Sequence, residues 1–151
     1  MKLEDAIRTT KFTDERHKAT LNLLYTAYWL KNQFSRVMKG QGLTMEQFNV
    51  MRILRGKAPQ PMCVKDISSR MIEKNSNVPR IVDKLVVKGL VARNTSPQDK
   101  RETLIELTEK GLKNLVRASQ ITERLSEDIL DLNDSDAAVL NSILEKMRKT
   151  D

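Results

Sequence analysis

The spacing of apolar residues changes at Gly89, and this change constrains the fold more than any other feature of the chain. Residues 77–88 place Val, Ile and Leu at helical spacing, whereas residues 101–107 alternate between apolar and polar positions, as strands do. Turn-forming residues at 95–100 separate the alternating segment from a short β-capable segment at 90–94. The sequence therefore predicts a helix, a glycine turn and a two-stranded β-hairpin with a charged tip.

Helical segments flank this unit on both sides. Thr44, with Gln47 three residues later, matches a capping box at the start of a helix. Pro79 must lie in the first turn of its helix, because proline lacks an N–H and clashes in a helix interior. The predicted helices span residues 14–38, 44–56, 64–72, 77–88, 108–130 and 133–147. Together these features predict a single domain, mainly α with a small β-hairpin.

Length and composition exclude several classes of protein. The chain has 151 residues, which suits one domain, and no apolar run approaches the roughly 18 residues that cross a bilayer. Its first residues include acidic groups and no apolar core, so we expect no signal peptide, no membrane partner and a cytoplasmic location. One cysteine, Cys63, and one histidine, His17, cannot form a four-ligand zinc site, so we expect neither a metal nor a cofactor.

The chain carries an excess of basic charge that is unevenly distributed. Its formal net charge is +7, with +6 in residues 1–60, +3 in residues 61–110 and −2 in residues 111–151. Such an excess indicates a polyanionic partner, above all nucleic acid. A short helix, a turn, a second helix and a basic hairpin together predict a winged helix-turn-helix whose second helix reads the major groove of DNA.

Candidate DNA-binding residues lie at the start of the second helix and at the tip of the hairpin. Amides and hydroxyls can read base edges, and arginine can bond guanine through two donors. A narrow minor groove attracts an inserted arginine. The residues with these properties are Asn75, Ser76, Asn77, Arg80 and Lys84 near the helix, and Lys100 and Arg101 in the hairpin. The alternative for each single charge is that it is only solvated surface.

Three short motifs carry a resemblance to a known family. The turn KGL at 88–90, the wing DKR at 99–101 and the exit LTEKG at 107–111 occur together in this chain. In this combination the chain resembles the MarR family of bacterial transcription regulators. The resemblance implies that Arg101 enters the minor groove and that Asp99 orients it. Pro79 stands where the family often has Thr or Ser, so we expect a different operator preference.

The resemblance also implies a homodimer. In the family the first and the last two helices intertwine, which assigns residues 1–40 and 112–151 to dimerisation helices and 43–111 to a winged helix-turn-helix lobe between them. The helix at 14–38 supports this, because its two adjoining apolar stripes must be covered on two sides. We therefore expect a homodimer that binds a pseudo-palindromic operator in double-stranded DNA and acts as a repressor.

Family members often bind small aromatic or lipophilic effectors between these two parts. Four aromatic residues of this chain are candidates for lining such a pocket: Tyr25, Tyr28, Trp29 and Phe48. An effector bound there would release the DNA by differential affinity for two forms of the dimer. The alternative is that these side chains are ordinary core aromatics.

Cys63 leaves two interpretations open. It begins the short helix at 64–72, where N–H groups favour a thiolate, so an oxidant-sensing regulator is one alternative. The favoured interpretation is a small apolar filler, because free cysteine is usually buried. Two other rivals are a winged-helix module that binds protein and an enzyme with Cys63 as nucleophile. The basic wing weighs against the first and the single histidine against the second, so we expect no enzyme.

Overall fold

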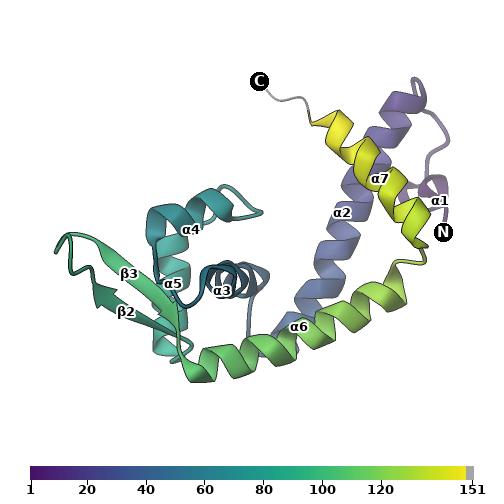
Figure 1. The fold of residues 1–151 in the computed structure, drawn as a ribbon. Helices are drawn as coiled ribbons and strands as arrows, with labels where there is room; N and C mark the ends of the chain where they lie inside the picture. The colour runs from purple at the N-terminus through teal and green to yellow at the C-terminus, as the bar shows by residue number, and fades with distance from the viewer. Residues whose placement is uncertain (149–151) are drawn as a thin grey trace.

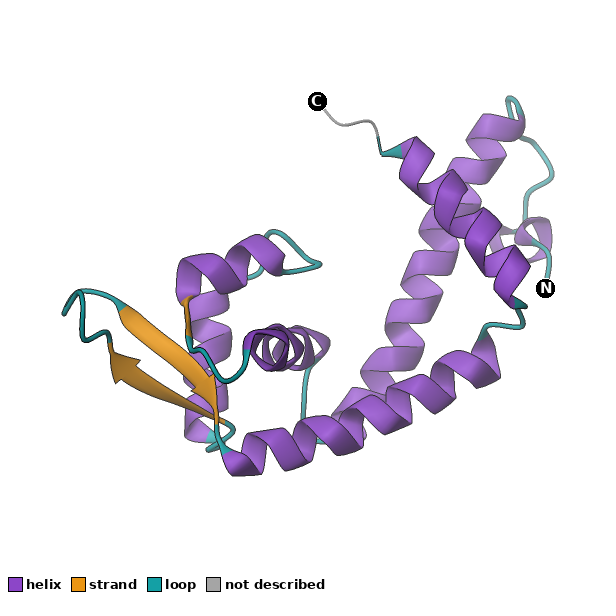
Figure 2. Ribbon diagram, viewed as in Figure 1, coloured by secondary structure: helices purple, strands orange, loops and turns teal. Residues whose placement is uncertain are grey.

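A computed structural model describes residues 1–148 and confirms a mainly α-helical chain with a small antiparallel sheet (Figure 1 and Figure 2). The helices are α1 (Leu3–Ile7), α2 (Glu15–Gly40), α3 (Met45–Lys57), α4 (Val64–Arg70), α5 (Val78–Val87), α6 (Glu109–Ile129) and α7 (Asp134–Met147). The strands are β1 (Met62–Cys63), β2 (Val91–Thr95) and β3 (Thr103–Leu107). No helix within the described residues is long and apolar enough to span a bilayer. The last part of the predicted dimerisation segment, 149–151, lies outside the described residues.

The helices and the sheet form a winged lobe and an extended helical part (Figure 1). Helices α3, α4 and α5 and the sheet surround one apolar core, which the end of α2 and the first half of α6 close through Met38, Leu115 and Ala118. Helix α7 lies away from this core, and none of its residues is buried. Burial of apolar area is the dominant favourable term in folding, so the winged lobe holds most of the stabilising contacts of one protomer.

Side-chain caps fix the starts of the helices in the winged lobe. Thr44 and Gln47 form the predicted capping box, each side-chain oxygen lying 3.2 Å from the backbone nitrogen of the other residue. Asn77 caps α5, and Pro79 lies in the first turn, as the sequence predicts. Each such cap contributes typically about 1 kcal/mol, so local sequence is enough to place these helix starts.

The sheet has three strands, so the prediction of a two-stranded hairpin is incomplete. Strands β2 and β3 form the predicted hairpin, and β1 adds to the other edge of β3, with Met62 opposite Ile105 and Cys63 opposite Leu104. A strand of two residues is too short to show an alternating pattern, which is why the sequence did not reveal it. The pairing joins the wing to the start of α4.

Two further predictions about helices need correction. Helix α1 was not predicted, because five residues are too few to show helical periodicity. Helix α4 ends at Arg70, earlier than the predicted 72, because Met71 takes an extended conformation. Met71 is buried, whereas the side chain of Ile72, just after the helix, is 87% exposed.

Hydrogen bonds connect the glycine turn after α5 to the start of α6. Gly89 has the positive φ of 69° expected of a helix-ending glycine, and its carbonyl accepts a 2.7 Å hydrogen bond from Oγ1 of Thr108. Nζ of Lys110 donates to the carbonyl of Lys88 at 2.8 Å. At Gly111 a Cβ atom would lie 1.9 Å from the carbonyl oxygen of Leu90, so only glycine fits. The KGL and LTEKG motifs thus fix the angle at which α6 leaves the winged lobe.

Candidate nucleic-acid interface

The start of α5 holds the candidate base-reading residues, but they differ in accessibility. Asn75, Asn77 and Arg80 are exposed, and Lys84 is exposed one turn further along the helix. Oδ1 of Asn77 accepts the backbone N–H of Arg80 at 3.2 Å, so its amide nitrogen is the group that can face a base. The hydroxyl of Ser76 is buried without a hydrogen-bond partner among the described residues. Ser76 therefore cannot read a base edge unless the turn rearranges, whereas the other four can.

The tip of the wing presents Lys100 and Arg101 to solvent. Oδ1 of Asp99 accepts the backbone N–H of Arg101 at 2.9 Å, and the N–H of Glu102 donates to the carbonyl of Asp99 at 2.9 Å. Below the tip, the N–H of Ser96 donates to the carbonyl of Glu102, also at 2.9 Å. Asp99 thus shapes the tip through the main chain of Arg101 and so sets the direction in which that side chain leaves the hairpin.

An ion pair that no pattern in the sequence predicts joins α5 to the wing. A guanidinium nitrogen of Arg93 in β2 bonds Oδ1 of Asp83 in α5. Beside it, the amide nitrogen of Asn94 donates to a carboxylate oxygen of Glu106 across the hairpin at 2.6 Å. The ion pair holds the wing against α5, whereas the bond between Asn94 and Glu106 joins the two strands of the wing to each other. The exposed charges in both elements were visible in the sequence, but their pairing was not.

Cys63 lies at the N-cap of α4, as predicted, and is half-buried. Its side chain makes no capping hydrogen bond. It lines an open cavity of about 410 Å³ together with Asp99 and Arg101 of the wing. This position brings the thiol near the candidate minor-groove arginine, so its chemistry can be tested through DNA binding.

Replacing Cys63 by serine is expected to leave DNA affinity within about twofold of the parent. The thiol makes no capping bond that a serine hydroxyl would lose, and serine is a preferred N-cap residue, worth roughly 0.5–2 kcal/mol over a residue that cannot cap. The measurement is the affinity of the parent and of Cys63→Ser for a DNA site selected from a random pool of duplexes, before and after mild peroxide. Release of the parent alone, reversed by a reductant, would establish the oxidant-sensing alternative instead.

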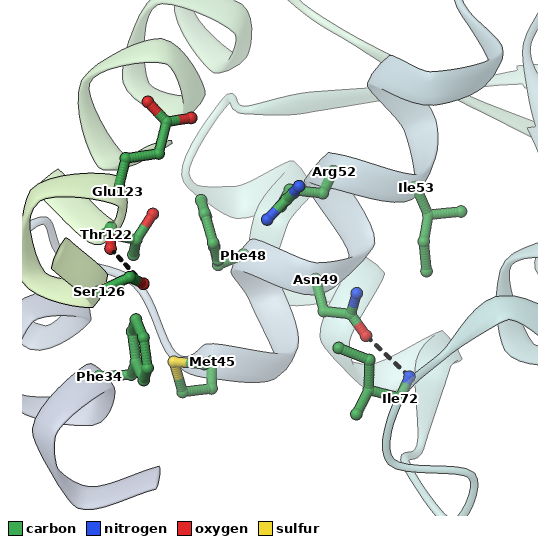
Figure 3. Close-up of a pocket in the computed structure, with 10 residues that line it drawn as sticks. All are labelled: Phe34, Met45, Phe48, Asn49, Arg52, Ile53, Ile72, Thr122, Glu123 and Ser126. Carbon is green, nitrogen blue, oxygen red and sulfur yellow. Dashed lines mark hydrogen bonds between the residues drawn. The ribbon is translucent and has the colours of Figure 1, made fainter. Parts of the chain in front are cut away.

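A cavity of about 530 Å³ lies between the winged lobe and the helical part (Figure 3). Five apolar side chains line it. Phe34 belongs to α2, Ile72 lies in the turn after α4, and α3 provides Met45, Phe48 and Ile53. Thr122, Glu123 and Ser126 of α6 close it on the other side. The hydroxyls of Thr122 and Ser126 donate to carbonyls of α6 itself. The charged side chains that line the cavity are Arg52 and Glu123 (Figure 3).

The four aromatic residues predicted to line one effector pocket do not lie together. Phe48 lines the cavity between the two parts, with the guanidinium carbon of Arg52 5.8 Å from its ring centroid. Tyr25 and Trp29 line a separate cavity of about 400 Å³ against the N-terminal residues. Tyr28 lines neither and is 69% exposed. The reason is the length of α2: about two and a half turns separate Tyr25 from Phe34, the residue of α2 that faces the inter-lobe cavity.

A metal site has no candidate in the part of the chain that the structure describes, where no three His, Cys, Asp or Glu residues are grouped so as to hold an ion.

The winged lobe and its motifs identify the family. Residues 43–103 match the model of the MarR family, and this range contains α3, α4, α5 and the wing tip. The winged lobe of this chain belongs to the MarR family. The winged helix-turn-helix inferred from the motifs is thereby confirmed, and with it the class of MarR-type transcription regulators.

Individual relatives extend the likeness beyond the winged lobe. The transcriptional repressor IacR of Pseudomonas putida is 29% identical over 126 residues, which cover 78% of this chain and 74% of IacR. The organohalide-sensing regulator RdhR in its 2,4-dichlorophenol-bound form superposes with a TM-score of 0.78 at 19% identity, over 89% of this chain and 80% of RdhR. MepR of S. aureus in complex with DNA superposes with a TM-score of 0.77 at 20% identity, over 91% of this chain and 96% of MepR. These two likenesses show that the fold shared with these two proteins extends over the helical part as well.

Proposed function

We propose that this MarR-family chain is a sequence-specific repressor that binds a pseudo-palindromic operator as a homodimer. The observation that carries the proposal is the joint exposure of Arg80 on α5 and Arg101 on the wing. The ion pair between Asp83 and Arg93 holds these two elements together, so that one can enter the major groove while the other enters the adjacent minor groove. The complex of the similar regulator MepR with DNA supports DNA as the partner, and the name of IacR supports repression.

The homodimer is supported by the apolar surface of the helical part. Helix α7 contains no buried residue, yet Val139, Leu140, Ile143 and Met147 are apolar and exposed within one protomer. Leu23 and Leu24 of α2 are exposed as well. Contiguous exposed apolar surface marks an interaction site, and a twofold dimer would bury it while presenting two recognition helices about one helical turn of DNA apart.

Release by a small effector is part of the same proposal. The inter-lobe cavity has an apolar wall and a volume suited to a small ligand. A ligand with an aromatic or lipophilic body would contact Phe34 and Phe48 there, and a polar group on it could face Arg52. The 2,4-dichlorophenol-bound form of the similar regulator RdhR supports this class of ligand. Tyr25, Tyr28 and Trp29 are outside this cavity and have no part in this proposed site.

Selecting bound sequences from a random pool of DNA duplexes tests the proposal most directly. A repressor dimer is expected to enrich two inverted half-sites whose centres lie about 10 base pairs apart. Enrichment of a single half-site would contradict the dimer, and no enrichment would favour the winged-helix protein-binding alternative.

The affinity of the dimer for its selected site should fall steeply with salt. The dimer presents eight cations, because each protomer contributes Arg80, Lys84, Lys100 and Arg101. Each contact of a cation with a phosphate releases counterions. If half of these eight cations touch phosphate, the slope of log affinity against log salt is about −3.6, at roughly 0.9 per contact. A titration from 50 to 300 mM salt measures it. A flat dependence would argue against phosphate contacts by these residues.

A further inference from the structure

One ion pair connects the helical part directly to the turn that precedes α5. Nζ of Lys31 in α2 lies 3.0 Å from Oε2 of Glu73, a residue of the turn between α4 and α5. Figure 1 shows that this turn extends from the winged lobe toward α2. The hydrogen bond to Glu73 also raises the pKa of Lys31, so the ammonium group stays charged across the neutral range. The pair thus joins two parts of the molecule that are separated by 42 positions in the sequence.

The main chain connects Glu73 to the start of the recognition helix. The carbonyl of Glu73 accepts the N–H of Ser76 at 3.1 Å, and the carbonyl of Ser76 accepts the N–H of Val78 at 3.0 Å. Asn77, which lies between them, caps α5. A displacement of Glu73 therefore moves the first residues of α5, including the side chains of Asn77 and Arg80.

The same turn is held from a second side, at the edge of the inter-lobe cavity. Oδ1 of Asn49 in α3 accepts the N–H of Ile72 at 3.0 Å (Figure 3). Ile72 and Phe34 line the cavity, and each is close in sequence to one member of the ion pair. The pair therefore joins two of the segments that line the cavity. Without it, the turn would keep the bond from Ile72 to Asn49 and the bond from Lys74 to the carbonyl of Ser69, and neither of these reaches α2.

We propose that Lys31 and Glu73 are positioning residues for DNA recognition. They form a latch, defined here as the Lys31–Glu73 ion pair, that fixes the turn before α5 against the dimerisation helix α2. This inference rests on the proposed function, because it assigns the latch a role in base readout. Its physical basis is preorganisation: a turn that is already ordered loses less conformational freedom when α5 enters the groove.

A double-mutant cycle on DNA affinity tests the latch. Lys31→Glu and Glu73→Lys each remove the attraction, whereas the double variant restores it in reverse and keeps the parent's net charge. Exposed ion pairs contribute modestly, so we expect the two changes to be coupled by about two- to fivefold per protomer in affinity for the selected site. Additive effects of the two single changes, with no recovery in the double variant, would overturn the proposal.

Hydrogen exchange in the free protein separates failure of the latch from failure of the proposed function. Lys31→Met should speed exchange at the amides of Ser76 and Arg80, while the temperature of unfolding stays unchanged. Lys39→Met is the matched control, since Lys39 is an exposed lysine of the same helix that makes no ion pair among the described residues. Equal exchange in both variants would overturn the latch. If exchange is faster in Lys31→Met but the parent protein binds no DNA, the latch is supported and its role in DNA binding is rejected.

Discussion

Replacing Ile143 by aspartate is expected to convert a dimer of this chain into folded monomers that no longer bind the selected site. Ile143 lies in α7 and is 52% exposed in one protomer, so its removal costs the protomer little packing. In a twofold interface the change places two unpaired charges in an apolar contact. The penalty for each buried ion is several kcal/mol, so the dimer dissociation constant should rise by at least about a thousandfold.

Light scattering or sedimentation across a dilution series measures this change in oligomeric state. Asn141→Asp is the matched control, because Asn141 is an exposed polar residue of the same helix and the substitution adds the same charge. Leu144 is less suitable as a test, since it is half-buried and its loss would also weaken the protomer. A parent that is already a stable monomer, or an Ile143→Asp variant that remains a dimer, would contradict the proposed interface.

Replacing Arg101 by alanine is expected to weaken DNA binding by roughly a hundredfold or more while leaving the fold intact. The side chain leaves an exposed hairpin tip, and its backbone N–H, which bonds Asp99, is kept in the variant. Hydrogen bonds to charged groups contribute about 1.5–3 kcal/mol each, and a dimer loses one such contact at each of two wings. Binding to the selected site at fixed salt is the measurement.

A charge-matched control separates groove insertion from the loss of general attraction. Arg16→Ala removes the same charge from the first turn of α2, at the end of the molecule far from the wing (Figure 1). If Arg101 inserts into a groove, its variant loses far more affinity than the Arg16 variant and also loses discrimination at the base steps under the wing. Equal losses in the two variants would contradict the role of Arg101 in the wing.

The family motifs of this chain were sufficient to predict the winged lobe because they act locally. Thr44 with Gln47, and Asn77 with Arg80, place helix starts through hydrogen bonds between residues three positions apart. Gly89 ends α5 because it adopts a positive φ that other residues avoid. The prediction that Asp99 orients Arg101 is compatible with the hydrogen bond from the backbone N–H of Arg101 to Asp99. The contact of Arg101 with DNA stays a prediction.

Predictions that depended on distant segments were less complete. The aromatic residues of α2 shared a helix, so the sequence could not tell which of them face the inter-lobe cavity; the structure places Phe34 there and Tyr25 and Trp29 elsewhere. Ser76 has the chemistry of a base-reading residue, but the turn directs its hydroxyl inward.

The sequence by itself determined the order of the helices after α1, the basic wing and the exposed start of α5, because periodicity, caps and turn residues are properties of neighbouring positions. Only the tertiary structure decided that β1 pairs with β3, that Arg93 bonds Asp83 and that Lys31 reaches Glu73. These contacts join segments far apart along the chain. Which residues meet in these contacts depends on how the helices pack around one apolar core, and a pattern of neighbouring positions carries no information about that packing.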